Sequence, residues 1–262
     1  MLRTIDEITG YVLRARDGEI GRCKDFLFDE EHWAIRYMVA DTGRWLPKRK
    51  VLVSPISLDE PIWAEQVLPV RLTKEQVENA PAVDEDAPVS RQHEIQFHTY
   101  YGWPYYWGMA DVWGEGAYPR PLYVEKKERG QKSPERPPEP TEDADPHLRS
   151  VKEVTGYHIQ ATDGEIGHVE GFIVDDETWE IRYMIVDTRN WLPGRKVLVS
   201  PTWITSMSWS DRKVFLDHTR DLIKESPEFD PSAPVNREYE ERLYDYYGRP
   251  RYWLRDPSTV NK

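Results

Sequence analysis

The stretch RTIDEITGYVLRARDGEIG at residues 3–21 returns as RSVKEVTGYHIQATDGEIG at residues 149–167. A constant offset of 146 residues aligns residues 3–107 with residues 149–253 without a gap. Over residues 3–55, 31 of 53 positions are identical to their counterparts. Self-similarity at a fixed offset is the signature of a repeated architecture. The chain is therefore a tandem duplication, and its two halves are named copy 1 and copy 2 below.

Four segments follow from the duplication. At 262 residues the chain exceeds the usual size of one domain. Residues 1–107 are predicted to form repeat 1, residues 149–253 repeat 2, and residues 254–262 a short tail. Residues 108–148 are predicted to be a linker, because the stretch EKKERGQKSPERPPEPTEDADPH is rich in proline and charge, which opposes compaction.

Composition limits the classes of function. The formal net charge is −12, and both copies are net acidic. Nucleic-acid binders usually carry a basic patch that displaces counterions, so no nucleic-acid partner is expected. The only cysteine, Cys23, excludes an intramolecular disulfide and fits a small apolar strand position. The sequence has no apolar run long enough for a leader or a spanning helix, which predicts a soluble, cytoplasmic protein without a transmembrane segment.

The fold is predicted to be mainly β, with two small β-barrels in tandem, each with a short helix and an aromatic C-terminal extension. In copy 2, Tyr157–Ala161 alternates apolar and polar residues, the pattern of a half-buried strand. Further strands are predicted at 168–174, 180–186, 196–199, 207–209 and 214–216, and a short helix at 219–224. Closure into a barrel is an economical way to hide the edges of such a sheet.

The Asp-Gly pairs predict tight hairpin turns, since glycine accepts positive φ and the Asp side chain bonds the backbone. The structural turn residues are Asp17, Gly18, Gly21, Asp163, Gly164 and Gly167. The carboxylates around each turn also allow a cation site or a proton relay. A metal site needs several converging oxygens, so the structural interpretation is preferred.

The same motifs resemble the PRC-barrel family over both copies. The resemblance rests on the patterns GYxxxxxDGEIG, F-x-x-D, RYMxVDT, WLP and KVLVSP. The matching positions are Tyr11, Asp17, Gly18, Gly21, Phe26, Asp29, Arg36, Tyr37, Asp41 and their counterparts 146 residues later. The family includes the cytoplasmic domain of the photosynthetic reaction centre H subunit and the C-terminal domain of the ribosome maturation factor RimM. The long region from Pro81 to Trp107 is most similar to the H-subunit branch.

No catalytic, cofactor-binding or metal-ligating residues are assigned. The sequence contains no GxSxG, HExxH, P-loop or dinucleotide motif, and the two copies share no histidine. An enzyme needs a convergent acid, base or nucleophile. We therefore expect a non-enzymatic protein without a cofactor.

An aromatic segment closes each copy and supplies the candidate partner-binding residues, because aromatic side chains are common interface anchors. They are Tyr100, Tyr101, Trp103, Tyr105, Tyr106, Trp107, Tyr246, Tyr247, Tyr252 and Trp253. The alternative is that each segment packs on its own barrel or on the other copy. The two readings are compatible.

The resemblance implies a protein-interaction or scaffold module with a protein partner. By that resemblance the partner is a photosynthetic or other membrane electron-transfer complex, with the protein peripheral at the inner membrane. The duplication itself implies intramolecular or homodimeric pairing of barrels. The alternative function is an RNA-processing or ribosome-assembly accessory of RimM-like type. Its RNA contacts would come from Arg49 and Lys50 beside Trp45, and from Arg195 and Lys196 beside Trp191.

Overall fold

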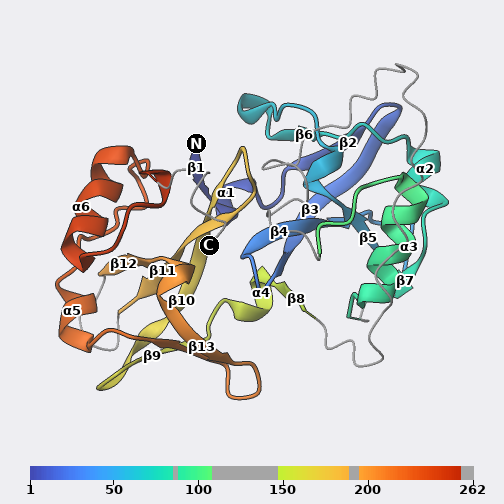
Figure 1. The fold of residues 1–262 in the computed structure, drawn as a ribbon. Helices are drawn as coiled ribbons and strands as arrows, with labels where there is room; N and C mark the ends of the chain where they lie inside the picture. Colours follow the sequence, from blue (N-terminus) through green and yellow to red (C-terminus); the bar gives the residue numbers. More distant parts are fainter. Residues whose placement is uncertain (85–87, 108–146, 189–194, 255–262) are drawn as a thin grey trace. The chain divides into compact units, whose positions relative to one another are not determined.

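The computed structural model describes residues 1–84, 88–107, 147–188 and 195–254. Most of the predicted linker and residues 255–262 of the predicted tail lie outside the described residues. The described part is mainly β, as predicted, with two seven-stranded sheets (Figure 1).

The first sheet has the strand order β6-β2-β3-β4-β5-β7. β2 pairs antiparallel with β3 and parallel with β6. The strands are β2 (Val12–Ala15), β3 (Gly18–Asp29), β4 (Ala34–Asp41), β5 (Arg49–Val53), β6 (Val67–Pro69) and β7 (Val83–Asp84). The hairpin of β2 and β3 turns at the predicted Asp-Gly pair.

The second sheet has the order β12-β11-β10-β9-β14-β13, and β1 (Leu2–Thr4) pairs with β10. Its strands are β9 (His158–Ala161), β10 (Gly164–Asp175), β11 (Ile181–Asp187), β12 (Lys196–Val199), β13 (Ile204–Ser208) and β14 (Lys213–Leu216). These bounds confirm the strands predicted for copy 2 to within a few residues. The strands that the 146-residue offset relates follow one another in the same order, β6-β2-β3-β4-β5 in the first sheet and β14-β9-β10-β11-β12 in the second. Closure of either sheet into a barrel stays a prediction.

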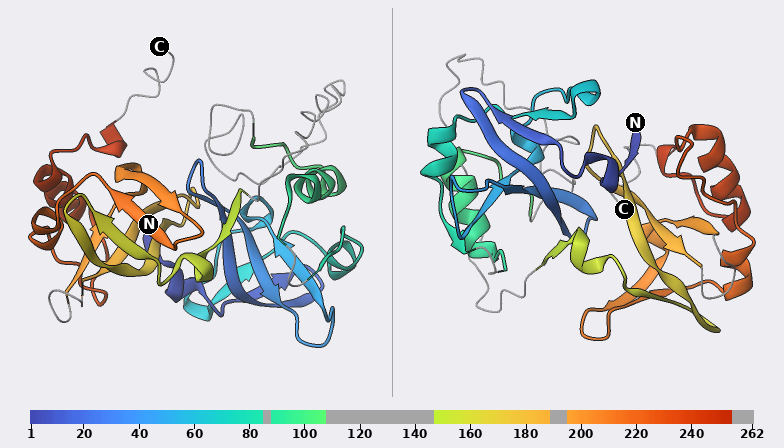
Figure 2. Two further views of the ribbon diagram at one scale, coloured as in Figure 1. Left: turned by 90° about the horizontal axis from the view of Figure 1, so that it is seen from below. Right: turned by 180° about the vertical axis from the view of Figure 1, so that it is seen from behind.

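Short helices flank the strands. α5 (Arg220–Lys224) confirms the predicted short helix, and the Thr219 side chain caps it by accepting from the Leu222 amide. The others are α1 (Ile5–Ile8), α2 (Lys74–Glu78), α3 (Arg91–Tyr101), α4 (Val151–Val154) and α6 (Arg237–Tyr247), with 3-10 turns η1 (Pro55–Ser57), η2 (Trp63–Glu65), η3 (Pro201–Trp203) and η4 (Tyr252–Leu254). In Figures 1 and 2, α3 lies beside the first sheet and α6 beside the second. These two helices lie in the regions predicted only as aromatic extensions.

The chain divides into two compact units, whose bounds differ from those of the two copies. The first unit holds Met1, residues 3–153 and residues 174–181, and the second holds Leu2, residues 154–173 and residues 182–262. The first unit thus contains two segments of copy 2.

One of these segments is β8 (Leu148–Ser150), which pairs antiparallel with β3. Its register places Leu27 opposite Ser150 and Phe28 opposite Arg149. The counterpart of β8 by the offset is β1, which pairs with β10, the counterpart of β3. Each long strand is therefore joined by the first strand of the other copy.

The other segment, residues 174–181, meets copy 1 through reciprocal backbone bonds within the first unit. The amide of Ile35 donates to the carbonyl of Trp179 over 2.8 Å, and the amide of Ile181 donates to the carbonyl of Trp33 over 2.7 Å. These four residues form two pairs related by the offset. Equivalent residues of the two copies thus make equivalent backbone bonds.

Two glycines of the turn motif are required by close backbone approach. A Cβ on Gly167 would lie 2.0 Å from the carbonyl oxygen of Asp187, and one on Gly21 would lie 2.1 Å from that of Asp41. No side chain fits at either place, which explains the glycine in both copies. The positive φ of Gly18 (147°) belongs to the turn itself.

The turn aspartates have a structural partner in each copy. Oδ1 of Asp17 accepts from the amide of Lys74 over 2.8 Å, and Oδ1 of Asp163 accepts from the amide of Arg220 over 2.8 Å. Both amides open a short helix. The bond from Arg220 lowers the pKa of Asp163.

In the described residues, no helix is long and apolar enough to cross a membrane.

Candidate functional site: a buried glutamate and aromatic cluster in each copy

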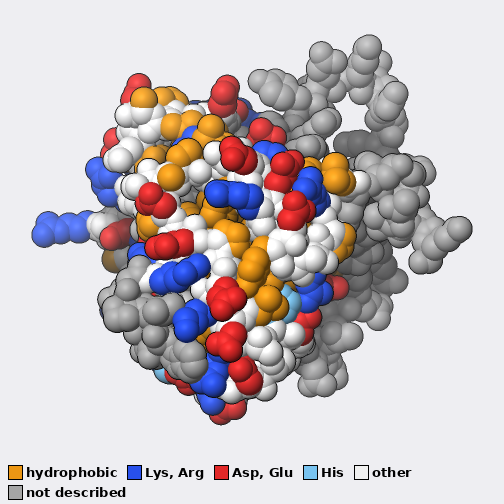
Figure 3. Space-filling view, turned by 90° about the vertical axis from the view of Figure 1, so that its left-hand side faces the viewer, with side chains coloured by type: hydrophobic (Ala, Val, Ile, Leu, Met, Phe, Trp, Pro, Cys, Tyr) orange, Lys and Arg blue, Asp and Glu red, His pale blue; other side chains and the backbone are white. Residues whose placement is uncertain are grey.

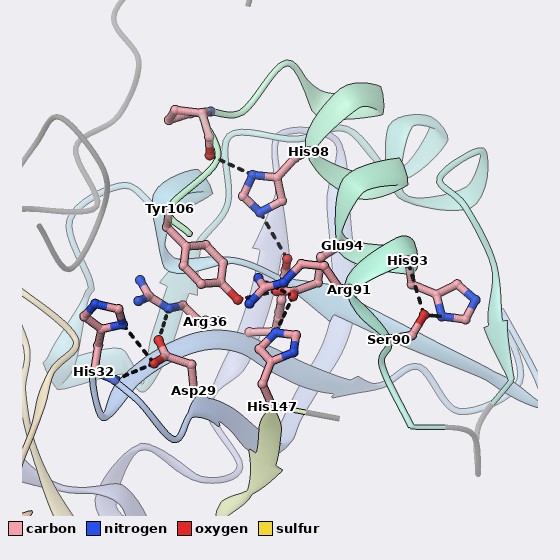
Figure 4. Close-up of polar contacts among 12 residues, drawn as sticks. Asp29, His32, Arg36, Ser90, Arg91, His93, Glu94, His98, Tyr106 and His147 are labelled. Atoms are coloured by element: carbon pink, nitrogen blue, oxygen red, sulfur yellow. Dashed lines mark hydrogen bonds and ion pairs between the residues drawn. The ribbon is translucent and has the colours of Figure 1, made fainter. Parts of the chain in front are cut away.

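The centre of the cluster in copy 1 is Glu94, in the first turn of α3. Its side chain is buried, at 0% relative exposure. Oε2 of Glu94 accepts from Arg91 over 2.9 Å and lies 2.6 Å from Nε2 of His147, while Oε1 accepts from the hydroxyl of Tyr106 (Figure 4). A buried carboxylate is tolerated only when it is paired and hydrogen-bonded, and here both oxygens are.

Glu240 occupies the equivalent position in α6, at 2% relative exposure. Its Oε1 accepts from the hydroxyl of Tyr183 over 2.7 Å and from that of Tyr252 over 2.8 Å, and its Oε2 pairs with Arg237 over 2.9 Å. Glu, Arg and the C-terminal tyrosine are thus kept in both copies. The cluster fastens the segment after each long helix onto the sheet.

The two copies differ at one position of the cluster, where copy 1 has His98 and copy 2 has Tyr244. Nδ1 of His98 lies 2.7 Å from the carbonyl of Pro104, so Nδ1 carries the proton and donates, and Nε2 lies 3.2 Å from the hydroxyl of Tyr37. Burial among aromatic rings, with Arg36 and Arg91 nearby, lowers the pKa of His98 to about 4, against the opposing effect of Glu94. The imidazole is therefore neutral near pH 7.

Asp29, Arg36 and His32 form a second polar group on β3, β4 and the turn between them (Figure 4). Oδ2 of Asp29 pairs with Nε of Arg36, and Oδ1 lies 3.2 Å from Nδ1 of His32. Burial opposes ionisation of Asp29, but its bond to His32 and the Arg36 charge lower the pKa of the carboxyl overall. The same bond raises the pKa of His32. The Arg36 guanidinium also lies 3.7 Å from the ring centroid of Tyr106, which connects the two groups.

An arginine over a tryptophan ring is found in both copies at the end of the aromatic segment. Arg91 lies 4.3 Å from the ring centroid of Trp107, and its counterpart Arg237 lies 4.2 Å from that of Trp253. Both tryptophans are half-buried. The side chain of Arg237 is 51% exposed and that of Arg91 is 22% exposed. Each arginine–tryptophan stack is therefore partly exposed.

The predicted aromatic residues divide by burial. Trp103, Tyr106 and Tyr247 are buried, and Tyr100 is exposed. The other six are half-buried; they are Tyr101, Tyr105, Trp107, Tyr246, Tyr252 and Trp253.

Several of these hydroxyls bond within their own copy. Tyr100 donates to the carbonyl of Gln76 over 3.0 Å, and Tyr246 donates to that of Leu222 over 2.8 Å, which ties α3 to α2 and α6 to α5. Much of each aromatic segment therefore has an internal structural role. Whether the accessible remainder binds a partner stays a prediction.

The chemistry available to the cluster is limited by its burial. A general acid or base must reach the substrate, whereas the oxygens of Glu94 and Glu240 face internal donors. In the described residues, no group of three or more His, Cys, Asp or Glu side chains is placed to hold a metal ion. The arrangement is suited to holding a segment in place.

Sequence reasoning did not single out Glu94, Glu240, Arg91 or Arg237. A signal was present, because both copies keep an Arg and a Glu three residues apart ahead of the aromatic segment. Such a pair is an ordinary feature of solvent-facing helices. Only the packing of α3 and α6 turns the two glutamates inward.

No family model matches the sequence, and no curated protein matches it.

Proposed function

We propose that the chain is a non-enzymatic interaction module of the PRC-barrel type, acting in the cytoplasm at the surface of the inner membrane. In this proposal it binds a protein partner, for which a photosynthetic or other membrane electron-transfer complex is the leading candidate by resemblance. The observation that carries the interaction role is the accessible arginine–tryptophan stack repeated in both copies, Arg91 with Trp107 and Arg237 with Trp253.

Physical reasons favour these stacks as anchors. Tryptophan and arginine are the residues most enriched among interface hot spots. A stacked guanidinium is already ordered, so less side-chain entropy is lost when a partner binds. The buried glutamates hold each stack, since Arg91 pairs with Glu94 and Arg237 with Glu240.

The PRC-barrel type rests on the sequence motifs. The common strand order of the two sheets supports one shared fold for both copies, with the parallel pairs β2–β6 and β9–β14 in equivalent places. Pairing of the copies within one chain is supported by the reciprocal bonds of Trp33 and Trp179.

Surface charge favours a protein partner over RNA. On the face drawn in Figure 3, Lys and Arg side chains alternate with Asp and Glu, and hydrophobic side chains lie between them. A mixed surface of this kind lacks the continuous positive field that phosphate backbones require.

Affinity purification of the tagged protein from its native source, followed by mass spectrometry, tests the proposal. The wild type is compared with Trp107→Ala/Trp253→Ala. The matched control is Trp45→Ala, because Trp45 is also half-buried and also lies beside a cation, with Lys74 4.4 Å from its ring centroid.

We expect membrane electron-transfer subunits to accompany the wild type and the control, and to fall by about ten-fold or more with the double variant. Circular dichroism of the double variant must match the wild type for the loss to count. Recovery of ribosomal proteins, or of the same proteins from all three samples, would overturn the proposal.

A further inference from the structure

Five aromatic rings of copy 2 lie one after another within the second unit. The ring centroids of Tyr246 and Tyr247 are 5.1 Å apart, and the centroid of Trp203 lies 4.6 Å from that of Tyr247. Tyr244 follows at 5.4 Å from Trp203, and Tyr252 at 6.0 Å from Tyr244. The three middle rings are buried, and the two end rings are half-buried. These rings, called the ring chain below, therefore join two partly exposed ends through the core of the unit.

Both copies place a tryptophan against the same tyrosine, although from different parts of the sequence. In copy 1, the ring centroid of Trp103 lies 4.3 Å from that of Tyr101, the counterpart of Tyr247. Trp103 follows α3, whereas Trp203 lies in η3, and the 146-residue offset does not relate them. Many apolar side chains would fill such a place. The recurrence of an indole favours a role for the ring in addition to its volume.

Indole and phenol rings lose a single electron more readily than aliphatic side chains, phenylalanine or a neutral imidazole. Electron transfer between rings falls off exponentially with their separation. Neighbouring rings therefore exchange an electron much faster than the two ends of the ring chain would directly. The ring chain divides one long transfer into four short steps.

A tyrosine that loses an electron also releases its hydroxyl proton, because the phenol radical cation is a strong acid. Tyr252 has an acceptor for this proton, since its hydroxyl donates to Oε1 of Glu240 over 2.8 Å. Burial and the Glu240 charge raise the pKa of Tyr252, so the phenol keeps its proton until the ring is oxidised. The buried carboxylate need not reach a bound molecule here, because the proton donor belongs to the same unit.

Copy 1 has a different ring at the centre of the equivalent arrangement. His98 stands where copy 2 has Tyr244, and its ring centroid lies 5.8 Å from that of Trp103 and 5.8 Å from that of Tyr106. Tyr106 and Glu94 repeat the terminal proton donor and acceptor. Because a neutral imidazole is harder to oxidise than a phenol, the rings of copy 1 are interrupted at His98.

We propose that the ring chain carries an oxidising equivalent from Tyr246 to Tyr252, with Glu240 as the proton acceptor at the Tyr252 end. The substrate is a strong one-electron oxidant, of the class of high-valent metal complexes, acting at Tyr246. The oxidant gains one electron and Tyr252 loses one. The O–H bond of Tyr252 breaks and its proton passes to Oε1 of Glu240, which leaves a neutral phenoxyl radical and a neutral carboxylic acid. This activity does not depend on the proposed function or on the arginine–tryptophan stacks.

Flash photolysis of the full-length chain tests the proposal. In a Cys23→Val background, Glu225→Cys carries a ruthenium polypyridyl photosensitiser, which a flash and an external quencher convert to ruthenium(III). Glu225 is exposed and directly follows α5, the helix to which the Tyr246 hydroxyl bonds. Transient absorption and electron paramagnetic resonance record the tyrosyl radical, and Tyr252→Phe identifies the part of the signal that belongs to Tyr252.

Tyr244→Phe removes the oxidisable phenol at the centre of the ring chain and keeps the shape of the side chain. We expect the wild type to form the Tyr252 radical and this variant to lose most of it. The matched control is Tyr239→Phe, because Tyr239 is also half-buried on α6 but bonds to the carbonyl of Pro227, outside the ring chain. Equal radical yields for Tyr244→Phe and the wild type, or no tyrosyl radical in the wild type after ruthenium(III) forms, would overturn the proposal.

Glu240→Gln tests the proton acceptor. Glutamine keeps an oxygen that accepts the hydrogen bond from Tyr252, but it takes up no proton. Formation of the Tyr252 radical should therefore slow and its yield should fall, provided that circular dichroism matches the wild type. A rate equal to that of the wild type would contradict proton transfer to Glu240.

The interruption in copy 1 provides a test by gain of activity. Asn79 is the exposed counterpart of residue 225, so Asn79→Cys places the photosensitiser at the equivalent position. We expect little radical at Tyr106 in this background, and an increase with His98→Tyr, which installs the residue of copy 2. A Tyr106 radical of the same yield with and without His98→Tyr would show that the central ring does not control the transfer.

Discussion

The hydroxyl of Tyr252 donates to Oε1 of Glu240 over 2.8 Å. The residue thus reaches back from the end of the aromatic segment to the first turn of α6. Tyr106 and Glu94 repeat the relationship in copy 1. Because the glutamate is buried in each case, the segment and the helix depend on each other for the pairing of their polar groups.

Removing the acceptor Glu240 should lower the free energy of unfolding more than removing the hydroxyl donor of Tyr252. Tyr252→Phe deletes one hydrogen bond and should lower the free energy of unfolding by about 1 kcal/mol. Glu240→Leu leaves the hydroxyls of Tyr183 and Tyr252 and the Arg237 charge without their acceptor, and should cost about 3 kcal/mol. Urea unfolding measures both. Tyr105→Phe, at a half-buried ring, is the control, and equal small losses for all three variants would argue against the cluster.

His98 should make the first unit less stable in acid. Its folded pKa is about 4, below the ordinary value of 6.5, so the unfolded chain binds the proton first as the pH falls. Stability is then lost as the pH falls through 6.5 towards 4, by about 3 kcal/mol over the whole range. The measurement is urea unfolding at pH 7 and at pH 4.5.

His98→Tyr supplies the matched comparison, since Tyr244 is the residue that copy 2 carries. The variant should lose less stability than the wild type between the same two pH values. Identical losses in both proteins would show that His98 does not govern the acid response.

His32 should have the opposite effect to His98 on the pH dependence of stability, because it stabilises the protein in acid. Its pKa is raised by Asp29, so its stabilising effect is complete below the unfolded value of 6.5 and disappears as the pH rises through the higher folded value. His32→Thr, which installs the residue found in copy 2, should therefore destabilise the protein more at pH 5.5 than at pH 8.5. Nuclear magnetic resonance titration of the His32 ring provides a direct check, and a midpoint below 6.5 would refute the pairing.

Gly167 should tolerate no side chain. A Cβ there would lie 2.0 Å from the carbonyl oxygen of Asp187, so the two strands would have to separate. We expect Gly167→Ala to cost more than about 3 kcal/mol in thermal or urea unfolding. Gly156→Ala is the control, because its Cβ meets open space and only the positive φ of 94° opposes it, at about 1–2 kcal/mol. Similar costs for both variants would show that close approach is not the reason for the glycine.

Several parts of the fold were predictable from local patterns. Local residue patterns predicted the Asp-Gly turns, the strands around Tyr157–Ala161 and 196–199, and the cap at Thr219. Each of these features depends only on residues that are neighbours in the sequence. The buried face of α3 and of α6 could not be predicted, because the sequence of a polar helix does not indicate which face packs against the rest of the protein. The buried glutamates were therefore missed.

The strand partners were unpredictable for a different reason. Leu2-Arg3-Thr4 and Leu148-Arg149-Ser150 are nearly the same, and so are the long strands that receive them. The duplicated sequence indicates that a short first strand pairs with a long strand. It does not indicate whether the two strands come from the same copy, because the long strand of either copy is a suitable partner. Only the three-dimensional arrangement decides between a strand kept in its own copy and one given to the other.

Cysteine cross-linking tests this strand sharing most directly. In a Cys23→Val background, Leu27→Cys/Ser150→Cys joins two residues that are opposite each other on β3 and β8. The alternative is Thr4→Cys/Leu27→Cys, which joins the pair expected if copy 1 kept its own first strand. Under mild oxidation, with peptide mass spectrometry as the readout, we predict an efficient disulfide for the first pair and none for the second. A disulfide in the second pair and none in the first would contradict the shared strand.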